Sequence, residues 1–143
     1  MARPPKRGLD YFPFDTDFFD DLKIMDLVDK YGPLGVTVFI ASLCIVYREG
    51  YYAEMSASRM AQVTTRMIGY RWVNRQNLVV EIIRYCGEIG LFDEALLCKD
   101  LITSAAIQKR YAEVTSRNKV DKSKYWLLSE KENEDRALES APD

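Results

Sequence analysis

One apolar stretch decides the fold: LGVTVFIASLCIVYRE at residues 34–49. Its hydrophobic side chains fall on almost every face of a helix, and a helix without a polar face is normally surrounded by protein. The apolar run from Leu34 to Tyr47 is too short to span a bilayer, which needs about 20 residues. We therefore expect a core helix in a cytoplasmic domain, with no membrane segment.

Another helix is expected just before this stretch. Hydrophobic side chains recur from Leu22 onward, and either Asp17 or Asp20 can cap the helix, because acidic residues suit a helix N-terminus. The tripeptide at residues 31–33, Tyr-Gly-Pro, ends it, since glycine and proline prevent simple continuation.

The segment after Gly50 alternates short elements. Residues 51–53 favour a brief strand, and Ser56 or Ser58 caps a short helix that Gly69 breaks. A cap at residues 74–77 begins an amphipathic helix that extends to Gly90. Its hydrophobic positions follow helical spacing: Leu78, Val79, Ile82, Ile83, Cys86 and Ile89.

Two more short strands are expected, at residues 91–92 and 101–103, and Thr103 or Ser104 caps a last helix. This order of elements predicts a mainly α fold: a winged helix, the helix-turn-helix variant with a small three-stranded sheet. The helix at about residues 74–89 takes the recognition position and the hairpin forms the wing.

Charge is segregated along the chain although the net charge is only −2. Five arginines and one glutamate occur between residues 59 and 84, and six acidic residues occur among the last fourteen. We divide the chain into a basic arm with docked aromatic anchors (1–18), the winged-helix domain (19–120) and a flexible acidic tail (121–143).

Residues for catalysis and metal binding are scarce. The chain has no histidine, and its cysteines, Cys44, Cys86 and Cys98, lack the paired spacing of zinc sites. The aspartates at residues 15–21 read as turn and cap residues, with a magnesium site as the alternative. No phosphate-binding loop or nucleophile motif occurs. We predict neither an enzyme, nor a cofactor, nor a small-molecule substrate.

Three basic groups are candidate DNA contacts, because arginine and lysine bind phosphates and arginine reads guanine. For each group the alternative is a solvated surface, with ion pairs to Glu81 and Glu88 in the second. The groups are Arg3, Lys6 and Arg7; Arg66, Arg71, Arg75 and Arg84, with Tyr70 and Trp72 among them; and Lys109, Arg110, Arg117 and Lys119, followed by Lys122 and Lys124.

Three stretches carry a family resemblance: RPPKRGLDYFP at residues 3–13, LCIVYREGYY at 43–52, and GLFD at 90–93 followed by ITS and IQKRY at 102–104 and 107–111. With them the chain resembles phage and prophage replisome-organiser proteins, which are related to DnaD-type replication-initiation proteins. The resemblance implies a winged-helix domain in phage-type DNA replication.

These observations together favour a non-catalytic module that binds double-stranded DNA, associates with itself and works beside replication proteins. The alternative is a protein-interaction or oligomerisation module of a replication complex that does not contact DNA. In that case the wing, or the apolar segment at residues 125–128, docks onto another subunit.

Overall fold

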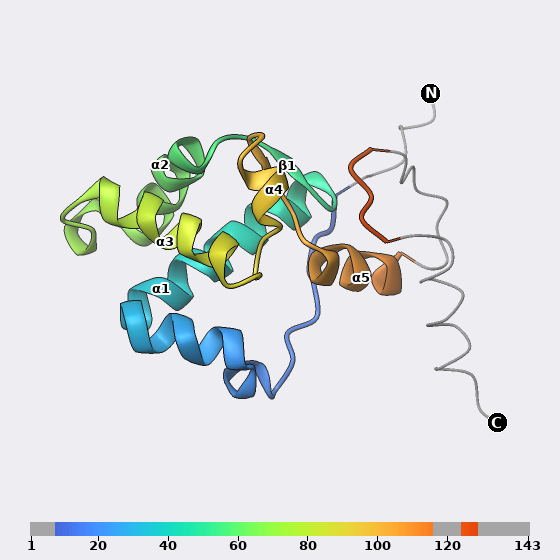
Figure 1. The fold of residues 1–143 in the computed structure, drawn as a ribbon, viewed down its shortest axis with the longest axis horizontal. Helices are drawn as coiled ribbons and strands as arrows, with labels where there is room; N and C mark the ends of the chain where they lie inside the picture. Colours follow the sequence, from blue (N-terminus) through green and yellow to red (C-terminus); the bar gives the residue numbers. More distant parts are fainter. Residues whose placement is uncertain (1–7, 116–123, 129–143) are drawn as a thin grey trace.

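The computed structural model describes residues 8–115 and 124–128. The described part is mainly helical with one small sheet, as expected (Figure 1). In chain order the elements are η1 (Phe18–Asp20), α1 (Leu22–Glu49), β1 (Ala53–Glu54), α2 (Ala57–Ile68), η2 (Tyr70–Trp72), α3 (Gln76–Glu88), α4 (Glu94–Leu97), β2 (Leu101–Ile102) and α5 (Ala105–Val114).

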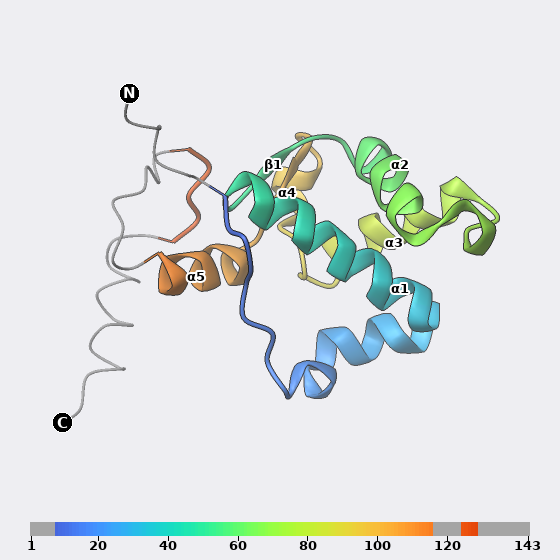
Figure 2. The same cartoon turned by 180° about the vertical axis from the view of Figure 1, so that it is seen from behind.

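The helices α1, α2 and α3 pack against one another, and the turn between α2 and α3 forms one end of the molecule. Helix α5 lies toward the opposite end, as both views show (Figures 1 and 2). Between these ends, β1 and β2 pair antiparallel, with Ala53 opposite Ile102 and Glu54 opposite Leu101. The core thus lies between the α2–α3 turn at one end and α5 toward the other.

Helix α1 contains a break where the sequence predicts one. Gly32 has non-helical dihedrals (φ 65°, ψ −151°), so two helical segments meet at this residue. The cap of the first segment is Asp21, and not Asp17 or Asp20: its carboxylate accepts hydrogen bonds from the backbone N–H groups of Lys23 and Ile24. The predicted cap was therefore misplaced, because neighbouring aspartates offer the same chemistry.

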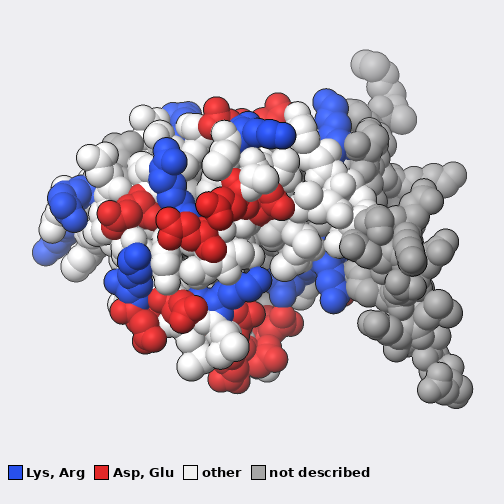
Figure 3. Space-filling view, viewed as in Figure 1, with Lys and Arg blue, Asp and Glu red and all other residues white. Residues whose placement is uncertain are grey.

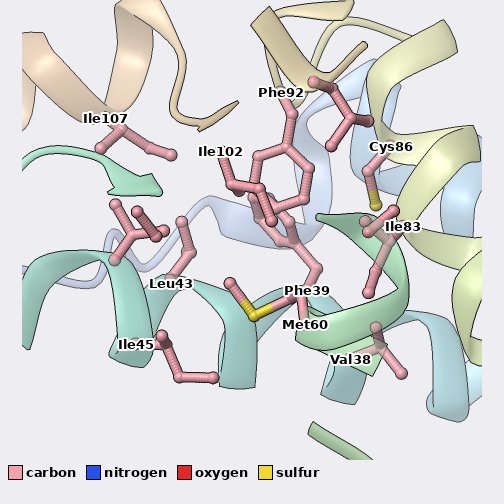
Figure 4. Close-up of a cluster of buried hydrophobic side chains, with 14 of the residues drawn as sticks. Val38, Phe39, Leu43, Ile45, Met60, Ile83, Cys86, Phe92, Ile102 and Ile107 are labelled. Carbon is pink, nitrogen blue, oxygen red and sulfur yellow. The ribbon is translucent and has the colours of Figure 1, made fainter. Parts of the chain in front are cut away.

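By length and composition α1 could cross a membrane, but 56% of its most apolar window is buried in the fold. The core helix of a globular protein passes the same test. Side chains from α1 gather in the core with those of α2, α3 and the loop after α3, as the close-up of Phe39, Met60, Ile83 and Phe92 shows (Figure 4). The rings of Phe39 and Phe92 lie 5.5 Å apart between centroids. Burial of α1 thus explains its apolar composition.

The described residues contain two strands, and the predicted third strand at residues 91–92 is wrong. The backbone N–H groups of Leu91 and Phe92 both donate to the carbonyl of Cys86, so they close the end of α3. Gly90, with φ 87°, makes this turn possible. The one ladder-like bond here joins the Asp93 N–H to the Thr103 carbonyl at 2.8 Å.

The segment at residues 93–100, between the strands predicted at 91–92 and 101–103, contains the helix α4. The Asp93 carboxylate caps it by accepting from the N–H of Leu96. Ser56 and Ser104 cap α2 and α5 by the same chemistry, as predicted. Helix α3 begins within the predicted range of residues 74–77, but its N-cap is Arg75 and no side chain caps the helix.

Residues 124–128 lie against the core although they belong to the predicted tail. The side-chain amide of Gln108 donates to the Tyr125 carbonyl at 2.8 Å, and its oxygen accepts from the Leu127 N–H. The Trp126 ring packs edge-on against Tyr51, with centroids 5.1 Å apart. The rest of the predicted tail lies outside the described residues.

The N-terminal aromatics dock only in part. Phe12 stacks on Tyr47 at 4.6 Å between centroids, and Phe18 packs against the core. In contrast, Tyr11, Phe14 and Phe19 are exposed. A set of aromatics close together in sequence therefore divides between core and surface.

Candidate nucleic-acid interface

The turn between α2 and α3 carries the most exposed group of basic and aromatic residues. Gly69, with φ 111°, ends α2 and turns the chain into η2. Val73 is buried and anchors the turn, while its neighbours project outward. We call the exposed set the α2–α3 knob; it consists of Arg66, Met67, Tyr70, Arg71, Trp72 and Arg75.

The two rings of the knob are open to solvent. Tyr70 is 71% exposed and Trp72 is 70% exposed. The guanidinium carbon of Arg71 lies 5.3 Å from the centroid of the Trp72 ring, a cation–π distance. Large aromatic side chains normally bury much of their surface, so this exposure marks a binding surface better than an isolated leucine would.

The knob has no acidic residue near it in sequence. Residues 55–80 contain four arginines and neither aspartate nor glutamate. Among the described residues none of these four arginines forms an ion pair. In Figure 3 the end of the molecule that bears the α2–α3 turn shows basic atoms, while acidic atoms gather over the middle of the same face. A polyanion would find a positive field at this end.

A shallow hollow extends the knob along α2. Its lining includes Arg59, Gln62, Arg66 and Tyr70. Arg59 donates to the side-chain oxygen of Gln62 at 3.1 Å. The hydroxyl of Thr65, which also lines the hollow, is buried and has no hydrogen-bond partner among the described residues. The hollow thus adds a fourth arginine to the polar surface beside the knob.

The start of α3 lies in the knob and differs from the other α-helices. Side chains cap α1, α2, α4 and α5, whereas Arg75 offers no cap to α3. In its first turn the Leu78 N–H donates to the Arg75 carbonyl at 3.1 Å, and no side chain of the N-cap accepts from the preceding N–H groups. A helix N-terminus beside arginines favours phosphate oxygens.

The outer face of α3 has a different character. Glu81, Arg84 and Glu88 are exposed there, and Glu81 accepts a hydrogen bond from the Tyr31 hydroxyl at 3.0 Å. Burial, together with this bond and the charge of Glu81, raises the pKa of Tyr31 to about 12. The first half of α1 therefore contacts the helix that was expected to enter the major groove.

The structure separates Arg84 from the arginines with which it was grouped. It lies nine residues beyond Arg75, about 13 Å along the helix axis. It lines a hollow with Glu88, Glu94 and Asp100. Arg66, Arg71 and Arg75 come together in the knob, and Arg84 faces an acidic neighbourhood.

The third basic group is only partly described. Arg110 forms an ion pair with Asp15 at 2.7 Å, and Lys109 is exposed nearby. Lys124 is also exposed. The remaining candidates of this group and of the N-terminal arm lie outside the described residues; they are Arg3, Lys6, Arg7, Arg117, Lys119 and Lys122. Sequence reasoning left Arg59 and Gln62 out of the site, although the acid-free run at residues 55–80 was a readable signal.

Among the described residues no group of three or more cysteine or acidic side chains could hold a metal ion. All three cysteines are free thiols. Cys86 is buried in the core, which raises its pKa to about 12, so it is a poor nucleophile. Cys98 is exposed and Cys44 is half-buried.

Comparisons with known proteins place the chain in a family. A family model described as "Lin1244/Lin1753-like, N-terminal" matches residues 11–107. A Listeria innocua serovar 6a protein described as "Uncharacterized phage-related protein Lin1244/Lin1753" is 31% identical over 121 residues. The match covers 83% of this chain and 38% of that protein, so the chain spans well under half of this relative's length. No solved structure matches the chain significantly. The chain belongs to the phage-related Lin1244/Lin1753-like N-terminal family.

Proposed function

We propose that this chain is a DNA-binding, winged-helix module of a phage-related replication protein of the replisome-organiser type. The observation that carries the proposal is the α2–α3 knob, where arginines without acidic neighbours surround an uncapped helix start. Phosphate contacts of this kind supply most of the affinity of DNA-binding proteins that do not select a sequence.

The order of elements supports a winged helix. A helix, a short strand, three helices and a returning strand follow one another, and the two strands pair antiparallel. In this assignment α2 and α3 form the helix-turn-helix. Helix α4 stands where the tip of the wing would be. The knob then occupies the turn and the start of the recognition helix, which approach the DNA backbone in such folds.

The charges on α3 favour contact through its first turn. Glu81 and Glu88 flank Arg84 on the outer face, and carboxylates oppose close approach to phosphates. We therefore expect backbone contacts from Arg66, Arg71 and Arg75, with little reading of base edges by the later turns of α3.

The role in replication rests on the resemblance of three sequence stretches to replisome organisers and on the phage-related family. Other replication proteins and further copies of the chain are partners that this role would require. We propose these two kinds of partner together with a location in the cytoplasm.

The test is fluorescence anisotropy of a labelled duplex titrated with the chain at about 50–200 mM salt, where counterion release is large. We expect micromolar binding that weakens with salt. The triple variant Arg66→Ala, Arg71→Ala, Arg75→Ala should reduce the slope of log affinity against log salt by about 2–3, since each phosphate contact contributes about 0.9. No duplex binding at the lowest salt, or a triple variant that binds as well as the wild type, would refute the proposal.

A second candidate function is protein interaction, and one specific observation favours it. Leu22, Met25 and Val28 are exposed along the first half of α1, and Phe19 is exposed in η1 just before it, away from the knob. The apolar segment at residues 125–128, the other docking surface expected from the sequence, instead packs on the core. Sedimentation of the wild type beside Leu22→Glu, Met25→Glu distinguishes the candidates, because an apolar contact is lost in this variant and is insensitive to salt.

A further inference from the structure

We infer that the α2–α3 knob takes unpaired bases on Trp72 and Tyr70, so that its preferred ligand is single-stranded or locally opened DNA. The inference rests on the proposed function, because it assumes that the knob binds DNA, and it goes further by naming the form of DNA. It assigns the two rings a role that phosphate contacts do not give them.

Both aromatic rings of the knob are open to solvent. Tyr70 and Trp72 lie within three residues of each other and each keeps about seven-tenths of its surface open. In a duplex the faces of the bases are stacked on one another, and a protein in the groove reaches only their edges. In a single strand the faces are accessible, and every base has one. Two open rings therefore match a single strand.

Arginines lie beside both rings. Proteins that bind single strands combine aromatic stacking with a positive groove that follows the backbone. Arg71 lies 5.3 Å from the Trp72 ring centroid, which puts a phosphate-binding group next to a stacking surface. The hollow lined by Arg59, Gln62 and Arg66 begins at Tyr70 and continues along α2. A strand stacked on the rings would find cations on both sides.

The turn that carries the rings is anchored to the fold. Val73 is buried, and the Trp72 N–H donates to the Gly69 carbonyl at 3.0 Å. Gly69 has φ 111°, a conformation that strains any residue with a side chain. The backbone that presents the rings is therefore held in one arrangement before a ligand binds, which lowers the entropy lost on binding.

The main rival is a protein partner, because tryptophan, tyrosine and arginine also dominate protein interfaces. The charge pattern favours DNA. Residues 55–80 contain four arginines and no acidic residue, a one-signed pattern that is complementary to a polyanion. A contact with protein remains one of the outcomes of the test.

The experiment compares two oligonucleotides of the same length and charge: oligo-dT, and an oligomer whose residues are all abasic. Anisotropy is measured at about 50 mM salt, where the shared electrostatic binding is strong. We expect the full chain to bind oligo-dT about 10-fold more tightly than the abasic oligomer, which lacks rings to stack. Trp72→Ala should remove most of this difference, so that the variant binds the two oligomers about equally.

Two variants control for structural effects. Trp72→Phe should retain much of the preference for oligo-dT, because phenylalanine still stacks. Tyr11→Ala, which removes another exposed ring, should change neither affinity. In a Trp126→Phe background, quenching of the single remaining tryptophan, Trp72, by oligo-dT reports stacking directly.

The outcomes separate this inference from the proposed function. Equal binding of oligo-dT and the abasic oligomer, with binding still lost in the triple arginine variant, would overturn base stacking and leave the duplex-binding proposal standing. Failure to bind any nucleic acid would overturn both. If Trp72→Ala abolishes self-association in sedimentation while leaving DNA binding intact, the knob is a protein contact and the inference is wrong.

Discussion

The two ends of the molecule carry basic residues in similar numbers but use them differently. At the α2–α3 knob the arginines are exposed, and none forms an ion pair among the described residues. At the α5 end, Arg110 pairs with Asp15, which lies 95 residues earlier in the chain. The charge of a sequence segment thus does not reveal its local field, because the compensating charge comes from elsewhere in the fold.

The same comparison applies to stability. Knob side chains project into solvent, whereas α5 contributes buried groups to a hydrogen-bond network. Substitutions at the knob should change binding with little effect on folding, and those at the α5 end should do the reverse.

The largest effect on stability is expected for Gln108→Ala. The buried amide of Gln108 donates to the Thr103 hydroxyl and the Tyr125 carbonyl and accepts from the Leu127 N–H. Its loss leaves polar groups without partners and opens a cavity, which together cost about 3 kcal/mol in the free energy of unfolding. Urea denaturation measures this cost.

Gln108→Leu is the matched control, because it keeps the volume and removes only the hydrogen bonds. It should lie between the wild type and Gln108→Ala. The triple arginine variant of the knob should differ from the wild type by no more than about 0.5 kcal/mol, as exposed substitutions do. A knob variant as destabilised as Gln108→Ala would contradict the division between the two ends.

A medium effect is expected for Tyr47→Phe. The buried Tyr47 hydroxyl donates to the Ile107 carbonyl at 3.3 Å, and losing this bond costs about 1 kcal/mol at pH 7. Burial also raises the pKa of Tyr47 to about 12, partly countered by Arg110. The contribution of this proton is full below the unfolded pKa of about 10 and is lost as pH rises toward 12.

The wild type should therefore lose on the order of 2–3 kcal/mol across this range from Tyr47 alone, and Tyr47→Phe should not. Urea denaturation of both proteins at pH 8 and at about pH 11.5 checks this, since the remaining tyrosines titrate in both and their effect cancels. A stability difference that does not change with pH would show that Tyr47 ionises normally in the fold.

The sequence predicted the helices best where periodicity and caps agreed. The break at Gly32 and the end of α2 at Gly69 are confirmed, and of the alternative caps Ser56 or Ser58 and Thr103 or Ser104 the structure uses Ser56 and Ser104. The strand predicted at residues 91–92 is absent, because the N–H groups of these residues bond to the last turn of α3. Side-chain β propensity carries no information about that backbone bond. Helix α4 was missed since four residues are too few for a periodic pattern.

The candidate site was predictable only as composition. The run of arginines around Tyr70 and Trp72 is visible in the sequence, but their exposure depends on which residue of the turn is buried, and Val73 takes that place. Arg84 was grouped with them by proximity in sequence. Its separation follows from the rise of α3 and from acidic residues that other elements bring near it.

The smallest effect is expected when Arg110 is released from its partner by Asp15→Asn. Both side chains are partly exposed, so breaking the pair should cost no more than about 1 kcal/mol of stability. The freed guanidinium can then contact phosphate, and duplex affinity at low salt should rise about 2-fold, roughly one weak contact.

Asp17→Asn removes the same charge from an exposed neighbour without freeing an arginine, so it measures the general effect of charge on anisotropy titrations. If Asp15→Asn exceeds Asp17→Asn, the α5 end resembles the knob once its acid is removed, and ion pairing explains the difference between the ends. If the two variants bind alike, the position of Arg110, and not its partner, keeps it from DNA.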